Sequence, residues 1–452
     1  MSHNQLADRV ASVMSPLVHA HSSIVVGLSG GVDSVVLLHL LHELAPRFSW
    51  KLSALHVHHG ISPNADAWSR FCEDLCARPH ILLRVERVDI TPLRAHGLEA
   101  AARKLRHEVF SRQACDFIAL AHHADDQVET LLLQLLRGAG VRGASAMPFH
   151  VKRAGAPDSL RPLLHCSRQE ILEYAAAHEL KWIEDESNAD DSYPRNFLRH
   201  RVLPLLGERF PAYRDTLSRS AQHFAEAGKL LDLLAQQDGA RSIAGETLAV
   251  ESLRSLEPAR AKNLLRYFLH GAGMPMPQVA QLEDMLRQLR DARLDAAVCV
   301  ELDGWQVRRY HGRVYALREM GAFDSDFAMP WQGEAELDWP ALNARLRFER
   351  NPNRREHSSA ISLAKLQHAP VTLRMRRGGE TLRPHPARAT RTLKNLLQEH
   401  EIPPWQRDRL PLLYCGDELV CVPGVAIAAE YLENGREEAI RVELQGAQAG
   451  KS

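Results

Sequence analysis

Strand-like and helix-like runs alternate along residues 24 to about 122, and this alternation constrains the fold more than any other feature. The strand-like runs are Ile24–Leu28, Leu52–Val57, Ile81–Val88 and Phe117–Ala121. The helix-like runs lie near 33–44, 66–77 and 99–113, and another helix is expected to start near Asp125. Alternation of this kind predicts βαβ units around a Rossmann-like parallel sheet.

Polar residues follow several of these strand-like runs. Ligands of a parallel sheet bind at the carboxyl ends of its strands. The segments that begin at such ends are Ser29–Ser34, His56–Gly60 and His122–Asp126. We therefore expect them to line one shared crevice.

The first of these segments, SGGVDS, has the composition of a phosphate-binding turn. Gly30 and Gly31 let the backbone approach a phosphate closely, and hydroxyls flank them. The lysine of the GxxxxGK[ST] loop is missing, which makes γ-phosphoryl transfer less favoured. Asp33 stands in the loop instead and would repel a phosphate unless a cation lay between them, so we infer Mg²⁺. The alternative is an ordinary strand-to-helix turn with a first-turn acid.

Length and pattern divide the rest of the chain. With 452 residues the chain is long enough for two to four domains. We expect a catalytic α/β domain over 1–211, a mainly helical domain over 212–325 with a β-like end, and a small α+β domain over 342–452. Lys+Arg and Asp+Glu are both 56, so net charge identifies no partner. Seven irregularly spaced cysteines, no signal-like start and no apolar run of about 20 residues favour a cytoplasmic protein without a membrane partner.

The motif Ser-Gly-Gly-x-Asp-Ser after a first strand resembles the PP-loop ATP pyrophosphatase group. Further stretches are similar to the tRNA(Ile)-lysidine synthetases, namely ALHVHHGIS (54–62), EAAARKLRHEVF (99–110), LAHHADDQVETLLLQLLRGAGVRGASAMP (120–148) and a basic segment from 371. The resemblance implies that ATP adenylates C2 of the wobble cytidine in a tRNA(Ile) with a CAU anticodon. Free L-lysine then displaces AMP, giving lysidine and switching codon reading from AUG to AUA. ATP and Mg²⁺ are the implied cofactors.

The resemblance also assigns roles within the crevice. The residues assigned to ATP are Ser29, Gly30, Gly31, Val32, Asp33, Ser34 and His58. Asp33 would also hold the metal, and Arg103 would neutralise the α-phosphate during adenylation. Asp126 and Glu129 share a helix face and would bind the lysine ammonium together with His122. The alternatives are a surface arginine at Arg103 and acids that merely favour a helix N-terminus.

Local basicity indicates where tRNA would lie. The predicted tRNA-binding residues are Arg137, Arg195, Arg374, Arg376, Arg377 and Lys394, in a chain that is neutral overall. Solvated faces or partners for the acids at 185–191 are the alternative reading. The oligomeric state stays open, with a homodimer as one option.

Other functions remain as rivals. A tRNA thiolase of the same group usually needs a reactive cysteine or an iron–sulfur cluster, and no Cys-x-x-Cys occurs here. Amidation of the GMP, NAD or asparagine synthetase kind is less favoured, because no glutaminase domain is evident. An RNA-binding module with a silent ATP site is the rival from another class.

Overall fold

A computed structural model describes residues 4–91, 98–153, 155–293, 296–352, 360–434 and 437–445. The chain forms two compact units, Met1–Leu230 and Leu231–Ser452. Their boundary lies inside one long helix, α10 (Tyr213–Gly239), whereas the sequence places a domain boundary at 211/212, just before that helix. In the described part of the chain, no helix combines the length and the apolarity that crossing a membrane requires.

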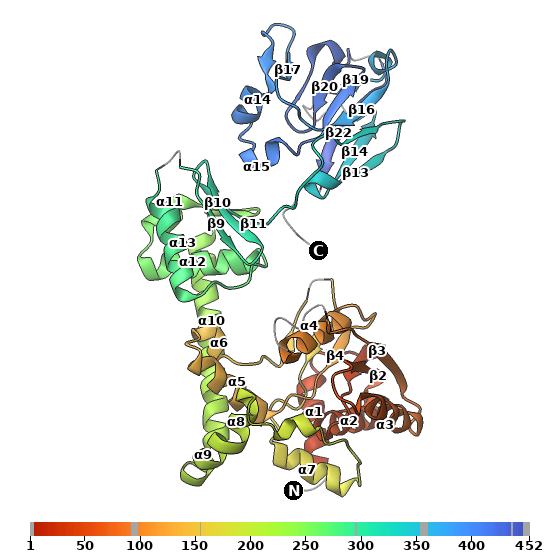
Figure 1. Ribbon diagram of the computed structural model, residues 1–452, viewed down its shortest axis with the longest axis vertical. Coiled ribbons are helices and arrows are strands. Elements are labelled where there is room, and N and C mark those ends of the chain that lie inside the picture. The colour runs from red at the N-terminus through yellow and green to blue at the C-terminus, as the bar shows by residue number, and fades with distance from the viewer. Residues whose placement is uncertain are drawn as a thin grey trace. The chain divides into compact units, whose positions relative to one another are not determined.

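The first unit is built on a six-stranded sheet with the order β3-β2-β1-β4-β6-β5. Figure 1 labels β2, β3 and β4 of this sheet. Its strands are β1 (Ser23–Gly27), β2 (Lys51–His58), β3 (Leu82–Arg87), β4 (Phe117–Ala119), β5 (His150–Val151) and β6 (Asp158–Leu160). Neighbours from β3 to β6 pair in parallel, and β5 pairs with β6 in the antiparallel sense. The predicted parallel sheet and its four predicted strands are therefore confirmed.

Helices lie between and around these strands. They are α1 (Asn4–Met14), α2 (Val32–Phe48), α3 (Ala65–Ala77), α4 (Leu98–Ser111), α5 (Ala124–Leu136), α6 (Val141–Ala144), α7 (Arg168–Ala177), α8 (Pro194–Phe197) and α9 (Leu203–Arg209). Of these, α2, α3, α4 and α5 occupy the places predicted for helices. α7 begins at a capping box, because Ser167 accepts a hydrogen bond from the backbone of Glu170 and the Glu170 carboxylate binds the Ser167 N–H.

The alternation of side chains along β1 explains why both faces of the sheet are covered. Ile24 and Val26 are completely buried in the larger core, which α1, α2 and α7 share. Val25 points to the other face and packs in the cluster that contains Phe110 of α4. Successive side chains of a strand point to opposite faces, so helices occupy both faces and the strand ends stay available to loops.

The second unit starts with three helices and a five-stranded sheet. The helices are α11 (Val250–Ser255), α12 (Pro258–Gly271) and α13 (Val279–Asp291). The sheet has the order β7-β8-β11-β10-β9, from β7 (Ile243–Ala244), β8 (Thr247–Ala249), β9 (Cys299–Leu302), β10 (Trp305–Tyr310) and β11 (Arg313–Arg318). The β-like end at 298–317 is confirmed. β7 and β8 were not expected, since two or three residues are too short to show an alternating pattern.

The remainder of the second unit is rich in strands. One sheet has the order β12-β16-β19-β20-β21 and another β13-β14-β22-β15, and β17 pairs with β18. The strands are β12 (Ala328–Pro330), β13 (Glu336–Trp339), β14 (Ala344–Arg350), β15 (Ile361–Ser362), β16 (Val371–Arg374), β17 (Thr381–Leu382), β18 (Arg391–Thr392), β19 (Leu412–Cys415), β20 (Glu418–Val422), β21 (Ala426–Ile427) and β22 (Ala439–Gln445). The helices α14 (Leu393–Glu399) and α15 (Pro404–Arg407) complete the expected α+β domain.

Candidate active site

The turn between β1 and α2 requires glycine at one position. Gly30 has φ +89°, in the left-handed region, and a Cβ atom there would lie 2.6 Å from Cδ1 of Ile183. Ile183 also donates its N–H to the carbonyl of Gly30 at 2.9 Å, so a distant segment packs directly on the loop. Gly31 has an ordinary φ of −71°. The tight turn is thus fixed by Gly30 and its contact with Ile183.

The side chain of Ser34 organises this loop from within. Its Oγ accepts hydrogen bonds from the N–H groups of Ser29 and Gly30 at 3.2 and 3.1 Å, and donates to the carbonyl of Gly31 at 2.9 Å. Ser34 is buried, at 4% exposure. These contacts bend the loop around one hydroxyl at the amino-terminal end of α2, where backbone N–H groups and the helix dipole favour an anion.

A cavity of about 360 Å³ opens at the carboxyl ends of the strands. The predicted residues that line it are Ser29, Asp33, Ser34, Arg103, His122 and Asp126. Further lining residues with polar side chains are His56, His59, Trp68, Arg106, His107 and Asp185. The three segments expected to share one crevice therefore do so. Gly30, Gly31 and Val32 shape the loop but are not among the lining residues, and the Val32 side chain is buried in the core.

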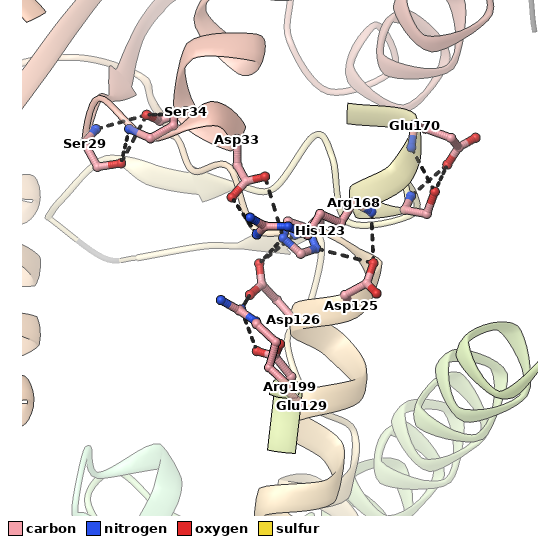
Figure 2. A network of polar contacts seen from close by, with 12 residues as sticks. Ser29, Asp33, Ser34, His123, Asp125, Asp126, Glu129, Arg168, Glu170 and Arg199 are labelled. Atoms are coloured by element: carbon pink, nitrogen blue, oxygen red, sulfur yellow. Dashed lines mark hydrogen bonds and ion pairs between the residues drawn. The ribbon is translucent and has the colours of Figure 1, made fainter. Parts of the chain in front are cut away.

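His123 contacts three acids, Asp33, Asp125 and Asp126 (Figure 2). Its Nε2 is 3.7 Å from Oδ1 of Asp33 and 3.5 Å from Oδ2 of Asp126. Arg168, the first residue of α7, approaches Asp33 to 3.9 Å. Burial raises the pKa of Asp33, although His123 and Arg168 act in the opposite direction. Asp33 is therefore an acid whose negative charge is only partly balanced.

The two predicted lysine-binding acids differ in their surroundings. Glu129 is completely buried, and its carboxylate binds Nε of Arg195 at 2.6 Å and Nε of Arg199 at 2.7 Å. Asp126 contacts Arg195 at 3.1 Å and also lines the cavity. Burial acts to raise the pKa of Asp126, but His123 and Arg195 outweigh it and hold that pKa below its ordinary value. Asp126 is thus a charged acid at the cavity wall, while Glu129 is enclosed by arginines.

A π-helix contributes to this arrangement. The segment Leu198–Val202 forms a π-turn between α8 and α9, directly after the segment that carries Arg195. Arg195 and Arg199 are four residues apart, so they share a face of this helical stretch and both reach Glu129. The sequence analysis named Arg195 as a tRNA-binding residue and gave no signal for the π-turn.

Histidines at the cavity are largely neutral. Burial lowers the pKa of His59 to about 4, of His107 to about 4 and of His122 to about 3. Nδ1 of His122 is buried and forms no hydrogen bond to the described residues. These imidazoles therefore offer hydrogen-bonding groups to a bound molecule without adding charge.

His58, the histidine that the sequence assigned to ATP, lies elsewhere. Its Nε2 is 3.1 Å from Oδ1 of Asp66, and Arg87 joins the same contact. His56 and His59 line the cavity instead. The HVHH run contained both residues, but the choice between them depends on the twist of the sheet and on α3, which carries Asp66.

Arg103 of α4 is exposed and lines the cavity, together with Arg106 one turn later. Lys104, the cation between them, is exposed and is not among the lining residues. Asp185 is a lining residue to which the sequence analysis gave no role in the crevice, although it stands at the start of the acidic stretch 185–191. It lies two residues after Ile183, so the contact of Ile183 with the loop brings it to the cavity.

The predicted tRNA-binding arginines of the first unit also differ. Arg137 caps the carboxyl end of α5 and is exposed. Arg195 uses its guanidinium on Glu129 and Asp126 within the protein. An exposed cation suits contact with a phosphate backbone, so Arg137 remains a predicted tRNA-binding residue, whereas the Arg195 guanidinium is engaged within the protein.

In the second unit, some basic side chains of the segment after residue 371 are paired within the protein and others are exposed. Arg374 donates to the carbonyl of Gly416 at 2.6 Å and stacks over Tyr414. Arg376 is 16% exposed and binds Asp408. Arg377, by contrast, is 70% exposed, with Asp326 at 3.6 Å, and Lys394 is exposed on α14. Arg377 and Lys394 are therefore the residues of this group that present charge to solvent.

Comparison with known proteins agrees with this geometry. Three family models match the chain: a PP-loop domain over 2–206, a TilS substrate binding domain over 248–315 and a TilS substrate C-terminal domain over 371–444.

Relatives named tRNA(Ile)-lysidine synthase align over most of the chain. The protein of Nitrosomonas europaea is 45% identical, covering 90% of this chain and 88% of the relative. That of Coxiella burnetii is 37% identical over 94% of both chains. That of Azoarcus sp. is 42% identical over 94% of this chain and 93% of the relative. The chain belongs to the tRNA(Ile)-lysidine synthase family of PP-loop proteins.

Proposed function

We propose that this protein ligates free L-lysine onto C2 of the wobble cytidine in a tRNA(Ile) with a CAU anticodon. ATP activates the cytidine and is converted to AMP and diphosphate. One observation carries the proposal: a single cavity of about 360 Å³ joins the Ser29–Ser34 loop, an exposed arginine and a charged acid. These are the groups needed to hold a leaving diphosphate, neutralise an α-phosphate and guide an ammonium.

The loop is suited to the diphosphate of ATP. Ser34 holds the backbone N–H groups of the loop in a tight bend at the start of α2, and Ser29 adds a hydroxyl at the cavity. A helix N-terminus with convergent N–H groups favours phosphate oxygens. This supports the assignment of the loop to the β- and γ-phosphates, which leave together as diphosphate.

The residues also fit a magnesium ion. Oδ1 of Asp33 is buried and accepts no hydrogen bond from the described residues. Carboxylate oxygens are preferred Mg²⁺ ligands, and a carboxylate beside a triphosphate needs a cation between them. Asp33 would hold the ion, which would neutralise phosphate charge during adenylation.

For lysine, we assign ammonium binding to Asp126 and a positioning role to Glu129. Asp126 lines the cavity and is charged, because His123 and Arg195 hold its pKa below the ordinary value against burial. Glu129 fixes Arg195 and Arg199, which in turn contact Asp126. The neutral imidazole of His122 accepts or donates a hydrogen bond without repelling the ammonium.

The surroundings of Cys115 and Cys166 favour lysine transfer over the rival sulfur transfer. Burial raises the pKa of Cys115 and of Cys166 to about 11, so neither carries an appreciable thiolate fraction near neutral pH. Neither residue is among those that line the cavity.

The deciding experiment follows label from lysine into RNA. The protein is incubated with Mg²⁺, ATP, ¹⁴C-lysine and a tRNA(Ile) transcript with a CAU anticodon, and the RNA is digested to nucleosides. We expect the label in a modified cytidine, with AMP and diphosphate in equal amounts. Formation of ADP and orthophosphate without labelled nucleoside would contradict the proposal. A transcript with a GAU anticodon is the matched control and should stay unlabelled.

A further inference from the structure

Two helices of the first unit contact each other at two places. α2 and α7 pack side by side. At their amino-terminal ends, Asp33 and Arg168 approach each other to 3.9 Å beside the cavity. At the carboxyl end of α7, His178, which follows its last residue, lies close to His39 and Glu43 from the middle of α2. This second contact lies outside the candidate active site and serves none of the roles assigned above.

The side chains at this end form a compact ligand set. One ligand atom each from His39, Glu43 and His178 lies within 4.8 Å of the other two. His39 and Glu43 are one helical turn apart and therefore share a face, with Nδ1 of His39 at 4.0 Å from Oε2 of Glu43. The rings of His39 and His178 have centroids 4.9 Å apart. The two histidines are half-buried and Glu43 is exposed, so the set is open to solvent on one side.

We propose that His39, Glu43 and His178 bind one divalent transition metal ion, with zinc the best match. Two imidazoles and one carboxylate are a common protein ligand set for Zn²⁺, with the fourth position left to water. Zn–N bonds are about 2.0–2.1 Å, so tetrahedral ligand atoms stand about 3.4 Å apart. Closing the present set to that spacing needs a shift of about 1 Å, which the exposed Glu43 side chain permits.

Tyr174 of α7 contacts all three of these side chains. Its hydroxyl donates to Oε2 of Glu43 at 2.9 Å and lies 3.0 Å from Nδ1 of His39. Its ring lies against that of His178, with centroids 4.2 Å apart. These contacts hold His39 and Glu43 close together in the metal-free protein, and a bound metal ion would take their place.

Bound metal would clamp the end of α7 to α2. Because Arg168 stands at the start of α7 and Asp33 at the start of α2, the same two helices position residues at the cavity. The metal site is therefore expected to act on stability and on the rigidity of this helix pair, without touching substrates.

Zinc binding is tested on the full chain after dialysis against EDTA. Zn²⁺ is titrated in competition with a chromophoric chelator, and Co²⁺ is titrated with detection of its visible absorption. We expect the wild-type protein to bind one equivalent more than His39→Ala or His178→Ala. His19→Ala removes an exposed histidine outside the set and should bind as wild type does.

Far-UV circular dichroism establishes whether each variant is folded. If an alanine variant unfolds, Glu43→Gln replaces it, because this change removes one ligand charge at an exposed position. Zinc should raise the melting temperature of wild type and of His19→Ala, and leave that of Glu43→Gln much less affected. Equal stoichiometry and affinity in wild type, Glu43→Gln and the histidine variants would overturn the proposal. The cluster would then be a helix contact held by the Tyr174 hydroxyl alone.

Discussion

Nε of Arg195 lies 2.6 Å from Oε2 of Glu129, and that carboxylate is completely buried between two guanidinium groups. The sequence pairs Glu129 with Asp126 as acids for the lysine ammonium. In the structure only Asp126 of the two lines the cavity. The two acids therefore have different expected roles: Asp126 binds the lysine ammonium, and Glu129 positions Arg195 and Arg199.

Glu129→Gln is expected to destabilise the fold more than it changes lysine binding. Removing the buried charge takes from Arg195 and Arg199 their closest acid and leaves them only Asp126, and breaking a buried pair of this kind costs about 3–5 kcal/mol. Urea unfolding at neutral pH measures the loss. Glu173→Gln on the exposed face of α7 is the matched control and should be nearly neutral. If the Glu129→Gln protein is fully stable and its KM for lysine is greatly raised, Glu129 binds the lysine ammonium directly and the positioning role is wrong.

Asp126→Asn is expected to raise the KM for lysine, because its charge faces the cavity. The asparagine has the same size as the aspartate, and its side-chain oxygen can still accept the hydrogen bond from the N–H of His123, the residue that caps α5. Steady-state kinetics at saturating ATP and tRNA report the effect. An unchanged KM for lysine would remove Asp126 from this role.

Gly30→Ala is expected to destabilise the protein, since Gly30 has φ +89° and a Cβ atom would meet Ile183 at 2.6 Å. Strained backbone of this kind costs about 1–3 kcal/mol. Gly31→Ala is the matched control, because its φ is −71° and the nearest atom to its Cβ is 3.6 Å away. The free energies of unfolding without nucleotide should separate the two variants, and equal values would refute the steric argument.

Asp33→Asn is expected to stabilise the fold at neutral pH in the absence of Mg²⁺, while abolishing activity. Burial raises the pKa of Asp33 in the folded state. The free energy of unfolding is therefore highest where Asp33 is protonated in both the folded and the unfolded state. It falls as the pH rises through the pKa that Asp33 has in the folded state.

The gain of Asp33→Asn should therefore be present at about pH 7 and disappear as the pH falls toward about 4, the ordinary pKa of aspartate. Asp66→Asn is a control of opposite sign, because Arg87 lowers the pKa of that exposed acid. Unfolding curves across this pH range that show no gain for Asp33→Asn would contradict the prediction.

Arg103→Ala is expected to lower kcat by about 10²-fold or more, as removal of a group that stabilises developing charge does. Lys104→Ala changes a neighbouring exposed cation that does not line the cavity and should leave kcat unchanged. Single-turnover formation of the adenylated tRNA separates this effect from substrate binding. Equal rates in the two variants would exclude the role.

Arg377→Ala and Lys394→Ala are each expected to weaken tRNA binding and to reduce the slope of log K against log salt by about 1. Both side chains are exposed. Arg376→Ala is the comparison, because Arg376 is mostly buried and binds Asp408, so its loss should reduce stability rather than the salt slope. Filter binding at several salt concentrations distinguishes these outcomes.

The sequence by itself determined the parallel sheet, the loop at its first strand end and the three segments that share the cavity. These features depend on local periodicity and on residues such as Gly30, whose backbone preference is independent of its neighbours. The family motifs added the chemistry, since they fix which residue types stand at the strand ends.

Only the tertiary structure decided how these side chains are used. Whether His58 or His59 reaches the cavity depends on α3, where Asp66 binds His58. Whether Glu129 is open or enclosed depends on a helical segment some 70 residues later in the chain, which brings Arg195 and Arg199 to its carboxylate. Such choices arise from packing and from charge pairing between distant segments, and the one-dimensional pattern does not contain the distances that govern them.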